Sequence, residues 1–492
     1  MTPLFMSLLF SGYSYAQVPL FEAQQTNFVQ TKNAEAVAQT QFGQPLFKLS
    51  TNTSSFFLPV QGNDIEFIKS TASTSSTGNL IWVGKSLDGD EITLIKSAKG
   101  ISGTIKVDSR IYKLQPNKRA GHNFIELDPA NQPDEHAPGY QPSSPSFSVS
   151  EQILTEQNYQ TALATNAQSN ITLLVLYTTT AAQKSADINS LIDLAIVETT
   201  QGYQNSGVNA VVSLAHVAQV NYTEATNSAT ALNRLAAKND GYMDEAHTLR
   251  DQYGANVVIL VNDVNGYCGQ ANAIGANAST AFAMVDYDCA TGYYSFGHEI
   301  GHLQGARHNP ENDPSTSPYA FGHGYQHPQS RSVMAYNCNS NCTRINYWSN
   351  PNKSYNGAVM GTATQHDNAR VLNLTNLTIA NFRSGTTTPP PSGNELQNNQ
   401  PITVNGAKNS EQLFTFTAPS GTQQVTITTS GGTGDLDLYV KYNGAASSNN
   451  YDCRPYKNGN NESCSDNRSG GYSIMVKGYT AFSNVSLTAS YQ

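Results

Sequence analysis

The sequence predicts an α/β domain with a twisted, mixed sheet at the centre of the chain, flanked by a β-rich N-terminal region and a C-terminal all-β sandwich. With 492 residues, the chain is too long for a single hydrophobic core. Apolar residues alternate with period 2 in several segments between residues 17 and 165, and strand and helix patterns alternate from about residue 169. Short strands at close spacing return after residue 395.

The composition suits a secreted protein better than a cytosolic one. Only 13% of the residues are charged, the net charge is −9, and Lys is sparse. Nucleic-acid binding usually needs a basic face, so we expect no nucleic-acid partner. No apolar run is long enough for a membrane span.

The N-terminus has the pattern of a secretory signal peptide over residues 1–16. An apolar stretch, Leu4 to Phe10, precedes small residues at Ser14 and Ala16, the spacing expected for cleavage before Gln17. The usual basic residues are missing, so either the signal is atypical or the start is misassigned.

Six cysteines, an even number, predict disulfides in an exported chain. Sequence proximity suggests three pairs, although other connectivities exist: Cys268–Cys289, Cys338–Cys342 and Cys453–Cys464.

Residues 17–168 resemble a propeptide in their organisation. Strands are expected within NLIWVGKS, EITLIKSA and GTIKVDSRIYKL, between Gly, Asp and Ser turns. The region ends in DEHAPGYQPSSPSFSVSEQ (134–152), whose Pro and Ser content predicts an exposed linker.

The central domain, residues 169–384, alternates strands and helices, which predicts a mainly parallel sheet. The expected strands cover residues 171–178, 210–223, 256–263 and 281–288. The expected helices cover residues 185–207, with Ser185 as N-cap, and residues 229–254, and a further helix begins near Ser295.

A Pro-rich linker at residues 385–395 precedes a sandwich at residues 396–492, with strands at 411–419, 423–431, 435–444, 471–479 and 483–490. Asp435 and Asp437 alternate on one of these strands. They are either Ca²⁺ ligands or polar positions satisfied by turn amides.

The stretch GHEIGHLQGARHNP carries the chemistry. On a helix, His298 and His302 lie on one face, one turn apart. Gly305 ends the helix, so that the chain turns back and brings His308 to the same metal ion. Three neutral imidazoles leave a fourth position of a Zn²⁺ ion open for water, and Glu299 is placed to act as the general base. This spacing predicts metal-assisted hydrolysis of an amide.

Two residues downstream extend the motif. Met334 in SVMAY stands 26 residues after His308, where an extended zinc motif of this kind is followed by a methionine turn. Tyr336 follows two residues later, and its phenol either stabilises the oxyanion or is an ordinary buried tyrosine.

These motifs, with RINYWSNPNKSYNG and MGTATQHDNARVLN, resemble the bacterial peptidyl-Asp metallopeptidases, a secreted branch of the metzincin proteases. The resemblance covers about residues 169–384. It implies a metzincin catalytic domain, zinc ligands His298, His302 and His308, the base Glu299, and cleavage on the amino side of Asp and sometimes Glu. Residues 396–492 are similar to bacterial pre-peptidase C-terminal domains.

An acid preference needs a cation in the pocket that receives the residue after the cut. The nearby candidates are Arg307, Arg331, Arg344, Lys353 and Arg370, and Arg344 is our first choice because it lies in the family-like RINYW run. The N-terminal region has no cysteine to block the metal, and the sequence leaves open whether another residue, such as His122 or Asp128, does so.

We therefore expect a secreted bacterial zinc endopeptidase, made as a preproprotein, that acts on protein or peptide substrates as a monomer. One alternative is a broader-specificity reprolysin-like protease, and another is a zinc amidase with non-peptide substrates. A third is a binding or adhesion protein with a vestigial protease domain. The intact Glu299 and histidines argue against the vestigial domain.

Overall fold

The computed structural model describes residues 19–27, 36–117, 121–136, 168–224, 228–264, 266–339, 341–383, 395–419, 421–442, 446–448 and 450–492. The expected signal peptide and nearly all of the expected Pro-rich linker lie outside the described residues. Two compact units result, one holding the N-terminal region and the central domain and the other holding essentially the C-terminal region.

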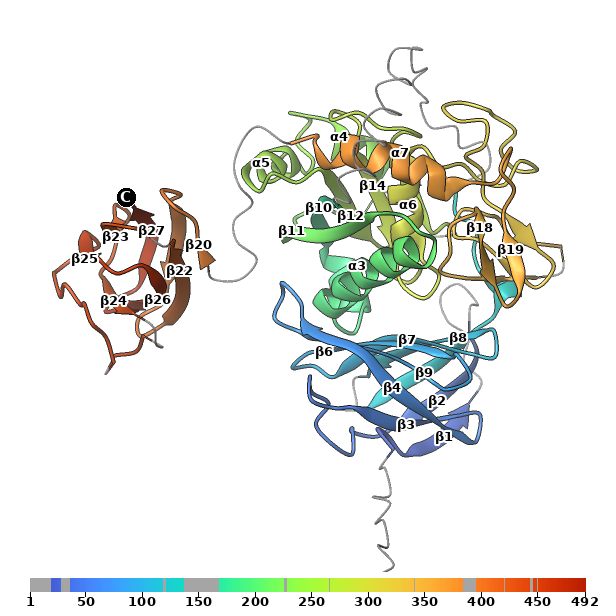
Figure 1. The fold of residues 1–492 in the computed structure, drawn as a ribbon, viewed down its shortest axis with the longest axis horizontal. Coiled ribbons are helices and arrows are strands. Elements are labelled where there is room, and N and C mark those ends of the chain that lie inside the picture. Colours follow the sequence, from blue (N-terminus) through green and yellow to red (C-terminus); the bar gives the residue numbers. More distant parts are fainter. Residues whose placement is uncertain are drawn as a thin grey trace, which may run out of the picture. The chain divides into compact units, whose positions relative to one another are not determined.

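The N-terminal region forms one antiparallel sheet with the strand order β1-β2-β9-β8-β7-β6-β5-β4-β3 (Figure 1). The strands are β1 (Ala23–Asn27), β2 (Ala36–Phe42), β3 (Ser55–Val60), β4 (Asn63–Thr74), β5 (Leu80–Lys85), β6 (Glu91–Lys96), β7 (Ile101–Val107), β8 (Arg110–Pro116) and β9 (His122–Leu127). Trp82, Phe56 and Phe67 fill its core. The β-rich character expected of this region is therefore confirmed.

The central domain is built on a mixed sheet with the order β11-β10-β12-β14-β13. Its strands are β10 (Ser169–Thr178), β11 (Ala210–Val220), β12 (Val257–Asn262), β13 (Gly269–Ala271) and β14 (Phe282–Asp286). The first four strands in this order run parallel, and the edge strand β13 is antiparallel to β14. Alternate residues of β10 and β12 face two separate apolar clusters, so both faces of the sheet are buried.

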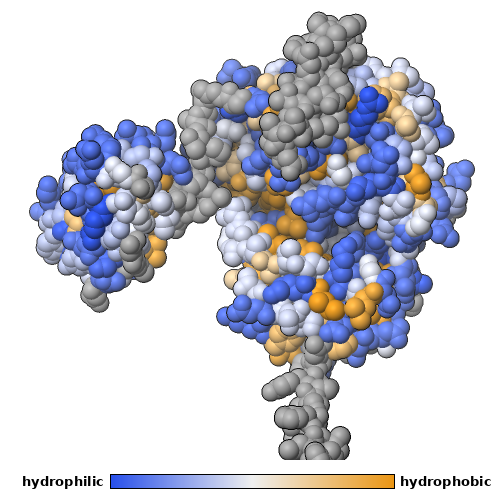
Figure 2. Space-filling model, in the orientation of Figure 1, coloured by the Kyte–Doolittle hydropathy of each residue, from blue (hydrophilic) through white to orange (hydrophobic). Residues whose placement is uncertain are grey.

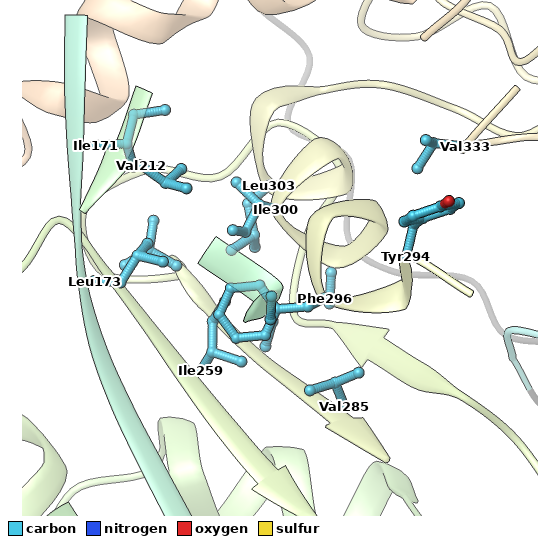
Figure 3. Packing of buried hydrophobic residues seen from close by; sticks show 14 of the residues in the cluster. Ile171, Leu173, Val212, Ile259, Val285, Tyr294, Phe296, Ile300, Leu303 and Val333 are labelled. Carbon is cyan, nitrogen blue, oxygen red and sulfur yellow. The ribbon is translucent and has the colours of Figure 1, made fainter. Parts of the chain in front are cut away.

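Helices cover both faces of this sheet. They are α2 (Thr179–Lys184), α3 (Ile188–Asn205), α4 (Ser228–Ala236), α5 (Glu245–Gln252), α6 (Ser295–Gln304) and α7 (Asn368–Ala380). In Figure 3, Phe296, Ile300 and Leu303 project from α6 toward the strands, among them β12 with Ile259. Because these three positions share one helix face, the histidines of α6 point elsewhere.

Two local predictions are wrong. Ser185 is the C-cap of α2, and the N-cap of α3 is Asp187. The single helix expected over residues 229–254 is two helices, because Asn239 and Gly241 adopt positive φ between α4 and α5.

The N-terminal sheet packs on α3 of the central domain through polar contacts. Asp193 of α3 accepts hydrogen bonds from Ser75 Oγ (2.8 Å) and Asn79 Nδ2 (2.9 Å) of the β4–β5 turn. Gln201 donates to Thr93 Oγ1 at 2.9 Å. Apolar side chains contribute as well, because Ile111 and Leu127 of the N-terminal sheet belong to the same buried cluster as the core of the central domain.

Short strands follow α6: β15 (Gln326–His327), β16 (Ser330–Arg331), β17 (Thr343–Arg344), β18 (Asn350–Tyr355) and β19 (Ala358–Met360). The structure contains the three disulfides Cys268–Cys289, Cys338–Cys342 and Cys453–Cys464. Cys268 and Cys289 are buried against Tyr293, beside the start of α6.

The C-terminal unit has two four-stranded sheets, β20-β22-β26-β24 and β21-β27-β23-β25. Their strands are β20 (Glu395–Leu396), β21 (Ile402–Gly406), β22 (Glu411–Ala418), β23 (Val425–Ser430), β24 (Leu436–Tyr442), β25 (Glu462–Asp466), β26 (Gly470–Gly478) and β27 (Phe482–Tyr491). Both sheets contribute to one apolar core, and hydrophilic or neutral residues dominate the face seen in Figure 2. The expected all-β domain is confirmed.

Asp435 and Asp437 of this unit already have protein partners. Asp435 accepts from the Gly459 N–H at 2.9 Å, and Asp437 pairs with Arg454 at 3.1 Å. Across the described residues, no helix has the length and apolar character needed to cross a bilayer.

Candidate metal centre

Helix α6 ends where its sequence predicts, at Gly305. Its last carbonyls are capped by the N–H of Gly305, which has φ +103° and ψ 4°. This left-handed conformation favours glycine and reverses the chain, as expected from the motif. The next residues return along the helix and bring His308 to the side of His298 and His302.

The three histidines present their Nε2 atoms to one point. The Nε2–Nε2 distances are 3.1 Å for His298–His302, 3.1 Å for His298–His308 and 3.0 Å for His302–His308. All three side chains are at least 94% buried. We call this set the histidine cluster.

The tautomers of two members follow from their neighbours. Nδ1 of His298 lies 2.9 Å from the carbonyl oxygen of Val333, and Nδ1 of His302 lies 2.9 Å from that of Ala306. Because a carbonyl only accepts, both Nδ1 atoms carry the proton and both Nε2 atoms present lone pairs. Lone pairs that converge at about 3 Å repel one another unless a cation lies between them. The donor set therefore fits a metal ion such as Zn²⁺, whose tetrahedral nitrogen ligands are spaced by roughly 3.3 Å.

Burial keeps the cluster in the form that binds metal. Desolvation lowers the pKa of His298, His302 and His308 well below the ordinary range for histidine, so the rings are neutral at pH 7. Neutral imidazole is the metal-binding state.

Glu299 lies beside the cluster and is fully buried. Neither of its carboxylate oxygens has a hydrogen-bond partner among the described residues. Burial raises the pKa of Glu299 well above its usual range, and the nearby Glu135 adds to this effect. A buried carboxylate without hydrogen-bond partners destabilises the fold. The presence of Glu299 here therefore indicates a catalytic role rather than a contribution to stability.

Glycines make room around this helix. A Cβ on Gly269 of β13 would lie 2.4 Å from Glu299 Oε1, so only glycine leaves that carboxylate in place. A Cβ on Gly301 would lie 2.4 Å from the Trp348 ring and 3.1 Å from Met334 Sδ. Met334 therefore packs against the helix that carries His298 and His302.

Tyr336 also reaches the cluster. Its ring lies edge-on to His308, with the ring centroids 4.6 Å apart. Burial raises the pKa of its phenol above the ordinary value, so the hydroxyl stays protonated and remains a hydrogen-bond donor.

A fourth imidazole, which the sequence analysis missed, completes the cluster. Nε2 of His136 lies 3.1 Å from Nε2 of His302, and its Nδ1 donates to the Gly269 carbonyl at 2.9 Å. Its Nε2 therefore also presents a lone pair, and the four histidines together form a group able to hold a metal ion. Residues 134–152 were expected to form an exposed linker. This prediction is wrong for Glu135 and His136, which are buried.

Neither residue considered earlier for blocking the metal reaches it. His122 accepts from the Ile101 N–H inside the N-terminal sheet, and Asp128 caps the short helix η1 (Pro129–Asn131). His136 gives no signal in the sequence beyond being a histidine shortly before the Pro-rich segment, because its register against β13 depends on the folded N-terminal region.

Residues 134–136 lie along the edge strand of the central sheet. Asp134 pairs with Tyr267 in a parallel bridge, and the Gly269 N–H donates to the Glu135 carbonyl at 3.0 Å. The Glu135 carboxylate accepts from Ser295 Oγ at 2.9 Å and forms an ion pair with Arg344.

The five candidate cations are placed very differently. Arg307 is held by both oxygens of Asp313, Arg331 donates to the Tyr293 hydroxyl, and Arg370 covers the Phe321 ring. Lys353 is exposed. Arg344 alone among them contacts a carboxylate beside the histidine cluster.

Comparison with known proteins agrees with this geometry. Residues 167–349 match the model of metallo-peptidase family M12, of the reprolysin type, and residues 410–478 match the bacterial pre-peptidase C-terminal domain. A peptidyl-Asp metalloendopeptidase from Xanthomonas campestris is 41% identical over 344 residues, which cover 66% of this chain and 81% of that protein. One from Stenotrophomonas maltophilia is 43% identical over 318 residues, 63% of this chain and 74% of that protein. The buried histidine cluster and these matches together show that the chain belongs to the peptidyl-Asp metalloendopeptidase family.

Proposed function

We propose that this chain is a secreted zinc endopeptidase that cuts peptide bonds on the amino side of Asp, and also of Glu. One observation carries the proposal: the imidazole Nε2 atoms of the histidine cluster converge beside the carboxylate of Glu299, whose oxygens have no hydrogen-bond partner among the described residues. The names of the relatives support the aspartate preference. We also propose that the central domain has the metzincin fold of this family.

His298, His302 and His308 would hold the zinc ion, which supplies Lewis-acid chemistry for activating water and polarising a carbonyl. Glu299 accepts a proton from the attacking water and delivers it to the amine as the C–N bond breaks. Tyr336, whose hydroxyl stays protonated, donates a hydrogen bond to the oxygen that gains charge.

In the intact chain, His136 occupies the position that water and substrate would need. Residues 134–136 thus keep the site closed, and residues 17–168 act as an inhibitory propeptide. Removal of this region exposes the edge strand β13, along which a substrate can pair in place of residues 134–136. The proposed order is secretion, cleavage after the propeptide, and then activity.

The experiment compares metal content and casein hydrolysis for the matured wild type, Glu299→Ala and His302→Ala. We expect about one zinc per chain in the wild type and in Glu299→Ala, and much less in His302→Ala. Only the wild type should hydrolyse casein, and a chelator should abolish this activity until zinc is added. Full activity of Glu299→Ala, or zinc-free activity, would refute the proposal.

A further inference from the structure

The environment of Glu135 is unusual for a residue of the N-terminal region. Its carboxylate is 2% exposed and contacts Arg344 and Ser295 of the central domain, and Tyr293 packs against Arg344. We call these three residues the acid pocket. The second oxygen, Oε2, has no partner among the described residues, so the pocket has not been saturated by its own chain.

Arg344 is fixed in an orientation that suits a carboxylate. Its Nη1 donates to the Tyr293 carbonyl at 3.0 Å, and its guanidinium lies 4.2 Å from the centre of the Tyr293 ring. The side chain is 1% exposed, and among the described residues the carboxylate paired with it is that of Glu135. Removal of the N-terminal region takes away the carboxylate that pairs with this cation, so the carboxylate of a substrate can take its place.

Glu135 and His136 are adjacent residues, like the two residues that flank a cleaved bond. His136 points to the centre of the histidine cluster, and the side chain of the adjacent residue enters the acid pocket. When a bond before an acidic residue is cut, the carbonyl at the metal likewise belongs to a residue adjacent to the acidic one. In the substrate that residue comes before the acidic residue, whereas His136 comes after Glu135, so residues 134–136 have the reverse chain order of a substrate. The pocket therefore lies one residue away from the reacting carbonyl.

We propose that Arg344, assisted by Ser295 and Tyr293, binds the acidic side chain that follows the cut, and that Glu135 occupies this subsite in the intact chain. The proposal rests on the proposed function of the histidine cluster. It names the residues that select the substrate, and it predicts that Glu is accepted as well as Asp because the chain's own occupant is Glu. The charge of Arg344 selects against neutral residues, which leave a buried cation unpaired.

The first test uses enzyme matured from the full chain and peptides with one internal Asp, replaced in turn by Glu, Asn and Leu. We expect the wild type to prefer Asp over Asn in kcat/KM by about 100-fold. Arg344→Met should remove nearly all of this preference, and Arg344→Lys should retain part of it. Arg370→Met is the matched control, since Arg370 is exposed and covers Phe321. The Arg370→Met enzyme should prefer Asp over Asn as strongly as the wild type does.

Because Arg344 is buried, its variants risk failing to fold, so a second measurement leaves Arg344 unchanged. Synthetic peptides of residues 129–136 are titrated by calorimetry into matured Glu299→Ala enzyme, which does not cut them before Asp134 or Glu135, with Glu135 kept, changed to Asp or changed to Gln. We expect Glu135→Gln to weaken binding by at least about tenfold and Glu135→Asp to bind like the original. Equal binding of all three peptides would overturn the proposal.

The outcomes separate this proposal from the proposed function. Hydrolysis that requires zinc and Glu299 but does not distinguish Asp from Asn would reject the acid pocket and keep the protease. An enzyme that cuts nothing would reject the protease, and the calorimetric comparison would still decide whether the pocket selects a carboxylate.

Discussion

The contact between Gly269 and Glu299 gives a prediction whose size follows from the structure. The Cβ of Gly269→Ala would lie 2.4 Å from Glu299 Oε1, about 1 Å inside an ordinary van der Waals contact. Gly269 does not need positive φ, so the backbone tolerates alanine. The clashing atoms belong to the outer part of a side chain, and the fold should adapt by moving the Glu299 carboxylate by about 1 Å.

A displacement of that size at a catalytic group costs about 100-fold in rate, or about 2.7 kcal/mol of transition-state stabilisation. We therefore expect kcat of matured Gly269→Ala to fall about 100-fold, with zinc content unchanged and a melting temperature close to that of the wild type. The assay is steady-state cleavage of a peptide with one Asp, with metal analysis and calorimetry on the same samples.

A double-mutant cycle tests the cause. If alanine at position 269 acts by displacing Glu299, it should add little to the loss already caused by Glu299→Ala. A further 100-fold loss in the Glu299→Ala background would refute the reasoning, as would wild-type activity of Gly269→Ala.

Three further predictions concern stability and latency. Gly301→Ala should lower the free energy of unfolding by about 1–3 kcal/mol, because its Cβ would lie 2.4 Å from the Trp348 ring; an unchanged melting temperature would contradict this packing. Burial raises the pKa of Glu198 from 4.5 to about 7, so the folded chain holds its proton to higher pH than the unfolded chain does. The stability that this proton contributes is complete below about pH 4.5 and is lost as the pH rises through 7, by about 3 kcal/mol in all. In urea titrations, Glu198→Gln should flatten the decrease of the free energy of unfolding with pH. A decrease as steep as that of the wild type would show that Glu198 is not its cause. Chelator should remove zinc from the intact chain more slowly than from the matured chain, by about tenfold or more, and His136→Ala should abolish the difference; equal release rates for intact and matured wild type would show that His136 does not bind the metal.

Much of the site could be predicted because its signals are local. The spacing of His298, His302 and Gly305 encodes a helix face and its termination within a few residues, and the structure has both features. The strands β10 and β12 are continuous apolar runs, which sequence patterns detect well.

The parts that were missed depend on contacts between distant segments. His136 joins the cluster only because the folded N-terminal sheet places residues 134–136 along β13, and a Pro- and Ser-rich stretch hides this. Strand β13 has three residues, too few for a periodic pattern to appear. The break between α4 and α5 follows from the backbone of Asn239 and Gly241, whose positive φ interrupts an otherwise helical pattern.

Mapping every cleavage site in casein by mass spectrometry tests the central claim most directly. The digests compare matured wild type, Glu299→Ala, and wild type with chelator before and after zinc is restored. We expect cuts before Asp, and fewer before Glu, that vanish in Glu299→Ala and with chelator and return with zinc. Cuts that persist in Glu299→Ala or without metal would contradict it.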